Sequence, residues 1–102
     1  MTQPTVTDNE AQRRYELRDG GETAGRLEYE DHGAVRVFTH TRVPAEHEGK
    51  GYGSKLAKAA LDDMRRRNRR IIAQCEFIDA YIRRHPEYED LRAPSAPGRE
   101  DR

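Results

Sequence analysis

The feature that most constrains the fold is a strand-like run, a glycine loop and a helical pattern in direct succession. The segment HTRVPAEHEGKGYGSKLAKAALDDM, residues 40–64, has glycines at positions 49, 51 and 53, and apolar residues then recur at helical spacing. Glycines let a backbone turn tightly and approach a ligand closely, and the free N–H groups that open a helix attract anions. A plain tight turn is the simpler interpretation, but three alternate glycines are costly in chain entropy for that purpose.

The rest of the chain predicts an α/β fold with a mixed sheet. Alternating residues predict strands over 13–18, 23–30 and 34–43, and the short turns between them indicate an antiparallel β-meander. In the third strand, positions 35, 37, 39, 41 and 43 are expected on one face, and positions 36, 38, 40 and 42 on the other. A buried strand over 69–75 and a helix from residue 76 to Pro86 complete the order, a meander followed by β-loop-α-β-α with a parallel crossover.

Length and composition predict one domain with a small core. The chain has 102 residues, of which 33% are hydrophobic and 37% charged. Residues 1–11 are polar and are expected to form a flexible N-terminus, and residues 12–91 are expected to form the domain. Residues 92–102 are rich in proline, glycine and charge, which predicts a disordered tail.

Charge and cysteine content narrow the partners and the compartment. The 19 basic and 19 acidic residues cancel, so bulk charge predicts binding to neither nucleic acid nor membrane. No secretory signal and no apolar run of about 20 residues is present. Cys75 is the single cysteine, which fits a reducing, cytoplasmic setting. The basic run RRRNRR, residues 65–70, is expected to be a solvated helix end, with an RNA-associated protein as the alternative.

The spacing of the glycines shows which of the known phosphate-binding motifs this loop can match. It fits neither the nucleotide P-loop nor the GxGxxG dinucleotide fingerprint. The segment EGKGYGSKLAKAAL instead resembles the acyl-CoA pyrophosphate loop of the GNAT superfamily of N-acetyltransferases, usually written [Q/R]xxGxG/A. Gly51 and Gly53 match its glycines, and Glu48 stands where the pattern has Gln or Arg. VFTHTRVP before the loop and CEFIDAYIRRHPEY after it resemble a subfamily of very small single-domain members, so that the resemblance covers most of residues 13–91.

This resemblance implies acetyl-CoA as cosubstrate and a place for it. The pantetheine arm is expected along Thr41, Arg42 and Val43, where that strand splays from the strand ending at IIAQC. The pyrophosphate is expected on the N–H groups of the loop, and Lys50, Lys55 and Arg83 or Arg84 either reach phosphates or are solvated charges. The expected cofactor-binding residues of the loop and the last helix are Glu48, Gly49, Lys50, Gly51, Tyr52, Gly53, Ser54 and Arg84.

Three residues are candidates for catalysis, each with a structural alternative. By the resemblance, Tyr81 is the acid that protonates the CoA thiolate, or else a core tyrosine. Cys75 is a nucleophile near the thioester, or else a buried free thiol. His40 is the base for an ammonium substrate, with Glu48 or Glu76 as substitutes, or else a surface histidine.

The histidines and the single cysteine show no metal-ligand spacing, so no metal is predicted. The function expected from the resemblance is an N-acetyltransferase in which an amine attacks the thioester of acetyl-CoA directly. The alternative is a non-catalytic or weakly catalytic acyl-CoA-binding or regulatory module. The sequence leaves the acceptor amine open, whether small molecule or protein, and predicts a monomer or weak dimer.

Overall fold

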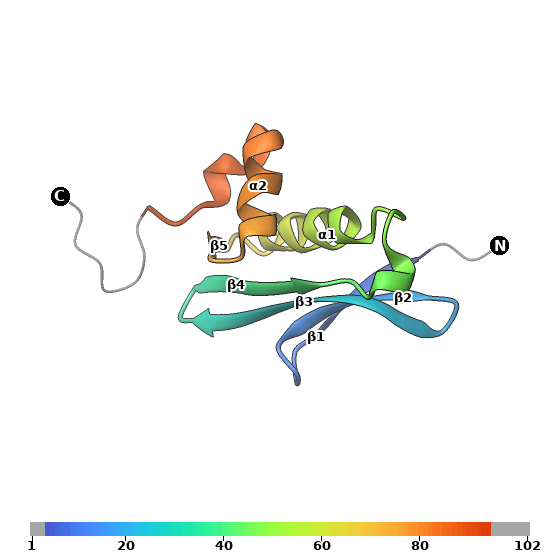
Figure 1. The fold of residues 1–102 in the computed structure, drawn as a ribbon. Helices are drawn as coiled ribbons and strands as arrows, with labels where there is room; N and C mark the ends of the chain where they lie inside the picture. The colour runs from blue at the N-terminus through green and yellow to red at the C-terminus, as the bar shows by residue number, and fades with distance from the viewer. Residues whose placement is uncertain (1–3, 95–102) are drawn as a thin grey trace.

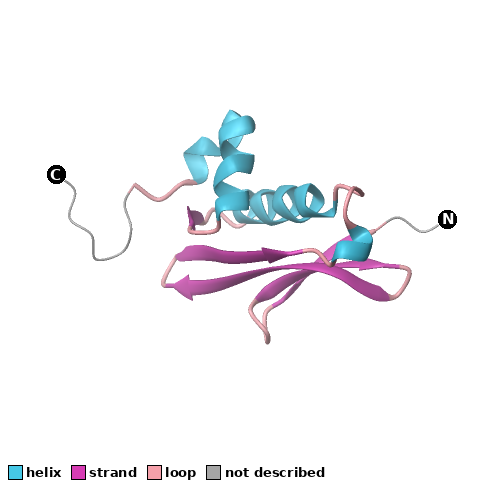
Figure 2. Ribbon diagram, viewed as in Figure 1, coloured by secondary structure: helices cyan, strands magenta, loops and turns pink. Residues whose placement is uncertain are grey.

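The computed structural model describes residues 4–94, which form a five-stranded mixed sheet with two α-helices (Figures 1 and 2). Two short 3₁₀ helices, η1 and η2, follow β4 and α2. The bounds are β1 Thr5–Asn9, β2 Arg14–Asp19, β3 Glu22–His32, β4 Val35–Arg42, η1 Ala45–His47, α1 Tyr52–Arg66, β5 Arg70–Ala73, α2 Glu76–Arg84 and η2 Pro86–Leu91.

The predicted α/β fold is confirmed. Strands β1 to β4 form an antiparallel meander, and β5 adds in parallel to β4 after the crossover through α1. Figure 1 shows α1 and α2 on the same side of the meander. One core lies between the sheet and these helices, and among its fully buried side chains are Leu17, Leu27, Phe38, Leu56, Leu61, Met64, Ile71, Ile78 and Ile82. The opposite, outer face of the meander is lined mainly by charged side chains.

A β-bulge in β4 corrects the predicted faces of that strand. His40 pairs with Glu28 and Phe38 with Tyr29, so Thr39 is the extra residue, and its hydroxyl donates to the Glu28 carbonyl at 3.2 Å. One inserted residue reverses the alternation on either side of it. Phe38 and Thr41 therefore share the core side, whereas Val37, His40 and Arg42 lie on the outer face.

The expectation of a flexible segment over residues 1–11 is wrong for residues 5–9, which form β1. Val6 packs against the core, and Asp8 faces Tyr15 across the β1–β2 pair. The alternation of TVTDN was the available signal, but the prediction gave more weight to its polarity and its position. At the other end, Ala93 donates to the Ile71 carbonyl at 2.8 Å, so the predicted tail begins with an ordered contact. Its residues 95–102 lie outside the described residues.

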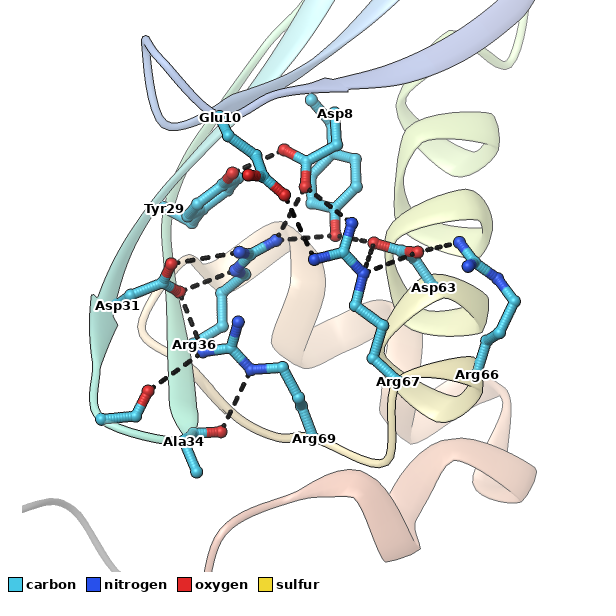
Figure 3. A network of polar contacts seen from close by, with 12 residues as sticks. Asp8, Glu10, Tyr29, Asp31, Ala34, Arg36, Asp63, Arg66, Arg67 and Arg69 are labelled. Carbon is cyan, nitrogen blue, oxygen red and sulfur yellow. Dashed lines mark hydrogen bonds and ion pairs between the residues drawn. The ribbon is translucent and has the colours of Figure 1, made fainter.

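A buried polar network ties β1 to the middle of the fold (Figure 3). Arg36 is 2% exposed, and its guanidinium donates to both carboxylate oxygens of Asp31, at 2.7 and 3.1 Å. The same guanidinium donates to Asp8 at 3.2 Å and to the Tyr15 hydroxyl at 3.0 Å. Tyr15 in turn donates to Asp63 of α1 at 2.7 Å. A buried charge is tolerated only when it is paired and hydrogen-bonded, and this network meets that need.

The arginine run at the end of α1 is solvent-exposed, as the sequence predicted, except at the partly buried Arg69. Each of its five arginines is hydrogen-bonded within the protein: Arg65 to Asp90, Arg66 and Arg67 to Asp63, Arg69 to Asp31, and Arg70 to the Asp90 carbonyl. These contacts join α1, β3 and η2. In residues 4–94, no helix combines the length and the apolar character that crossing a membrane requires.

Candidate functional site

Strands β4 and β5 separate at the middle of the sheet. Their pairing runs from Val35 and Arg70 to Phe38 and Ala73, and the Cys75 N–H then donates to the Phe38 carbonyl at 2.9 Å. Beyond this point β5 ends and the chain turns into α2, whereas β4 continues along β3. The last four residues of β4 therefore have a free edge toward α2. Backbone N–H and C=O groups on such an edge are open to an extended ligand.

The glycine loop turns the chain from η1 into α1. Gly49 and Gly51 have φ angles of +85° and +75°, in the left-handed region that favours glycine. Gly51 is the N-cap of α1, which has no side-chain cap and no acidic residue in its first turn. The first bond of the helix runs from the Lys55 N–H to the Gly51 carbonyl, at 3.1 Å. The preceding N–H groups are left for water or an anion, with the positive end of the helix dipole behind them.

A groove of about 330 Å³ connects the free edge of β4 with the start of α1. Gly53 forms part of its wall together with Phe77 of α2, because a Cβ at Gly53 would lie 2.8 Å from the tip of the Phe77 ring. Its lining comprises Thr41, Val43, His47, Glu48, Gly49, Gly51, Tyr52, Gly53, Ser54 and Phe77. The groove thus has a strand edge along one side and an uncapped helix N-terminus at its end.

Most of the predicted cofactor-binding residues border this groove, but three do not. Arg42 projects to the outer face of the sheet, opposite Arg26. The Lys50 ammonium lies 5.7 Å from the Tyr52 ring centroid, and Arg84 is exposed on α2. The Tyr52 side chain is buried and its hydroxyl donates to Asp19, which anchors the loop to the end of β2.

Two groove residues were missed from the sequence. Phe77 of α2 is only partly buried and lines the groove. His47 was one of several scattered histidines, and its ring lies 5.7 Å from that of Tyr52. The signal for Phe77 was present in Gly53, because a glycine within a helix frequently marks a close approach. His47 had no comparable signal.

The three catalytic candidates occupy different environments. Cys75 is partly buried at the opening between β4 and β5, and its sulfur lies 3.2 Å from the Thr41 hydroxyl. His40 is 73% exposed on the outer face, with Nδ1 3.6 Å from a Glu28 carboxylate oxygen. Tyr81 belongs to the core and stacks on His85 at 4.1 Å between ring centroids. Burial raises the pKa of Tyr81, which makes the phenol a weaker acid.

The fold also gathers three potential metal ligands. Oxygen or nitrogen atoms of Glu22, Glu46 and His47 lie within 4.8 Å of one another, and the first two residues are exposed. Within residues 4–94, His47 Nδ1 is buried without a hydrogen-bond partner. Ligand spacing along the sequence does not reveal this group, because Glu22 comes from β3 and the others from η1. The absence of a metal stays a prediction.

Comparisons with known proteins agree on one family. The profile of the family described as GCN5-related N-acetyl-transferase matches residues 14–91. A GCN5-like protein from Staphylococcus aureus, solved in solution by NMR, superposes with a TM-score of 0.69 at 22% sequence identity, and the match covers 100% of both chains. The crystal structure of ribosomal-protein-alanine N-acetyltransferase from Brucella melitensis biovar Abortus 2308 superposes with a TM-score of 0.57 at 17% identity, over 86% of this chain and 66% of that one. No curated protein sequence matches the chain.

Proposed function

The chain belongs to the GCN5-related N-acetyltransferase family, and we propose that it transfers an acetyl group from acetyl-CoA to an amine. The observation that carries this proposal is the groove in which the uncapped N-terminus of α1 meets the free edge of β4. A helix N-terminus binds a pyrophosphate through its N–H groups and its dipole. A free strand edge hydrogen-bonds an extended chain that carries amide groups, as a pantetheine arm does.

In this proposal the parts of acetyl-CoA follow the groove in order. The pyrophosphate lies on the N–H groups of residues 49–54. Lys50 and Arg84 lie outside the groove lining, and their long side chains are proposed to reach the phosphates from there. The pantetheine arm pairs with the backbone of Thr41 to Val43. The thioester then lies beside Thr41 and Cys75, at the point where β4 and β5 separate. Glu48 borders the groove and adds a negative charge there, so the backbone rather than this side chain holds the phosphates.

The reaction proceeds through direct attack of the neutral amine on the thioester carbonyl. A new C–N bond forms as the C–S bond breaks, the amine loses a proton, and the CoA thiolate leaves and is protonated. N–H groups of the free β4 edge polarise the carbonyl oxygen. His40 is proposed as the base. The buried position and raised pKa of Tyr81 weaken its case as the acid, and Tyr81→Phe tests it: an unchanged rate would remove Tyr81 from the mechanism.

One observation favours the alternative, an acyl-CoA-binding module with little or no turnover. Cys75, His40 and Tyr81 lie respectively at the strand opening, on the exposed outer face and in the core. A site that binds acetyl-CoA needs only the groove, whereas catalysis needs acid and base groups within reach of the thioester.

The first experiment is the melting temperature of the protein with acetyl-CoA, with free CoA and with ATP. Ligand at 100 times its dissociation constant adds about 2.7 kcal/mol to stability, which raises the melting temperature of a domain of this size by several degrees. A shift with both CoA species and little with ATP supports the proposal. No shift at millimolar acetyl-CoA contradicts both the enzyme and the binding module.

Release of the CoA thiol across a panel of amines and peptides then separates the two functions. Acetylated product supports the transferase, and CoA binding without any product supports the binding module. We also propose a cytoplasmic location, supported by the single free thiol of Cys75, and a monomer or weak dimer.

A further inference from the structure

A second pocket lies on the other side of the β4 end, and the proposed function does not use it. Its volume is about 510 Å³, larger than that of the groove. Its lining comprises Arg14, Thr23, Gly25, Arg26, Thr41, Arg42, Val43, Pro44 and Ala45, which includes three arginines and no acidic residue. Arg14, Arg26 and Arg42 all project from the outer face, because each pairs in register with a neighbour on that face.

The arginines present unused donors to this pocket. Arg26 hydrogen-bonds Glu28 through Nε at 2.8 Å, and Arg14 hydrogen-bonds Glu16 in the same way at 2.8 Å. In both, the terminal nitrogens make no hydrogen bond to any residue in 4–94, and Arg42 has no ion pair within that range. A guanidinium held through Nε keeps its outer nitrogens free to donate to the oxygens of a carboxylate or phosphate.

The arrangement of Arg26 and Arg42 is itself unfavourable without an anion. The two residues are directly opposite each other in the β3–β4 pair, and like charges at such positions destabilise a sheet. Glu28 offsets part of the charge of Arg26, whereas Arg42 faces the same space with no carboxylate of its own. An anion between the two guanidinium groups would relieve the repulsion and hydrogen-bond both.

We propose that this outer pocket is the acceptor site, and that the acceptor is an amine that also carries a carboxylate or phosphate bound by Arg26 and Arg42. This proposal rests on the proposed function. Its geometric support is that Thr41 and Val43 line both the groove and the pocket, so a donor and an acceptor in the two hollows meet at the same stretch of β4. His40 projects from the same face of β4, two residues before Arg42.

The substrate test compares pairs of amines that differ only in the acidic group. One arm sets β-alanine against propylamine, and the other sets phosphoethanolamine against ethanolamine. Two charge-assisted hydrogen bonds are expected to favour the acidic member by about tenfold or more in kcat/KM. The arm with the larger ratio of kcat/KM, acidic member over neutral member, shows whether the bound anion is a carboxylate or a phosphate. Equal rates within every pair, or faster acetylation of a polyamine, would overturn the proposal.

The variants are Arg26→Gln and Arg42→Gln, with Arg18→Gln as the matched control from the same face outside the lining. Each of the first two is expected to lower the acid-to-neutral ratio by about tenfold, and the control to leave it unchanged. A variant that slows acidic and neutral amines equally would show that its arginine does not select for acid. Arg26→Gln should keep the melting shift with acetyl-CoA, which reports the groove and not the pocket.

A binding measurement keeps the proposal testable if no amine is acetylated. The CoA-saturated protein is titrated with glutarate and with inorganic phosphate, and backbone amide shifts are followed by NMR. Shifts confined to residues around Arg26 and Arg42, and lost in Arg26→Gln, would support the anion site even where turnover fails. Absence of such shifts at tens of millimolar anion would overturn the anion site, while the melting shift with acetyl-CoA would still stand for the groove.

Discussion

The two ends of β4 use the same strand in opposite ways. Its first half is paired on both sides, with β3 and β5, and its Arg36 is 2% exposed within a network of carboxylates and tyrosines. Its second half is paired with β3 alone and borders two hollows. The bulge at Thr39 lies between the halves. Helix α1 shows the same division, because its last turns contribute Asp63 to the network and its first turn opens the groove.

The difference separates stability from function in this small domain. The buried guanidinium of Arg36 joins β4 to β1, β2 and β3 through Asp8, Tyr15 and Asp31. The Tyr15 hydroxyl extends the network to Asp63 of α1. At the other end, within residues 4–94, no side chain caps the N–H groups that open α1, so these groups depend on a ligand or water for hydrogen bonds. Variants in the network should therefore change the free energy of unfolding, and variants in the groove should change the affinity for acetyl-CoA.

The largest effect is expected from Arg36→Met. Removing this buried guanidinium takes one partner from the largely buried Asp8 and the main partner from the more exposed Asp31, which costs about 2 kcal/mol or more. Urea unfolding measures the loss. Arg18→Met, on the exposed outer face, is the control and should change stability by no more than about 0.5 kcal/mol. A loss below about 1 kcal/mol for Arg36→Met would show that the network does not stabilise the fold as described.

Gly53→Ala should weaken acetyl-CoA binding by about tenfold. The new Cβ would lie 2.8 Å from the Phe77 ring tip, and the displaced ring would enter the groove, with an overpacking cost of about 1–3 kcal/mol. Isothermal titration calorimetry measures the affinity. The double variant Gly53→Ala with Phe77→Ala removes the clash, so it should regain most of the affinity that the single variant loses. Wild-type affinity in the single variant would place the ligand elsewhere.

Ser54→Asp should change stability and binding in opposite directions. An acidic residue in the first turn of α1 interacts favourably with the helix dipole, by about 0.5 kcal/mol. The melting temperature of the ligand-free protein should therefore rise slightly. The same charge lies where the pyrophosphate is proposed to bind, so acetyl-CoA should bind several-fold more weakly. Ser54→Ala is the neutral control. Tighter binding by the aspartate variant would contradict an anion site at this helix end.

The smallest effect is a pH dependence at the network end. Hydrogen bonds from Arg36 hold the pKa of Asp31 below its ordinary value of 3.8. Because the folded pKa lies below the unfolded one, this stabilisation is complete above pH 3.8 and is lost as the pH falls through the folded pKa. In Asp31→Asn the free energy of unfolding should therefore fall less steeply as the pH is lowered. Urea unfolding at several pH values measures this dependence. Glu46→Gln, beside the glycine loop, is the control and should leave the pH dependence of the unfolding free energy unchanged.

The sequence by itself determined the order of elements and the character of the groove. Alternation along β2 and β3 and helical spacing after Gly53 are local properties, and each placed its element within a few residues. The glycines at 49 and 51 permit the left-handed backbone that the structure shows there, which only a few residue types adopt readily. The start of α1 was therefore predictable before any contact was known.

The tertiary structure alone decided which side chains meet. No residue type marks the bulge at Thr39, yet it places His40 and Arg42 on the outer face and Phe38 in the core. Arg36 is buried because Asp8, Asp31 and Tyr15 converge on it from three other strands, and such long-range charge pairing has no local pattern. The position of Tyr81 against His85 likewise depends on packing between α2 and its neighbours. Backbone geometry follows from adjacent residues, whereas burial and ion pairing follow from partners that are distant in the chain.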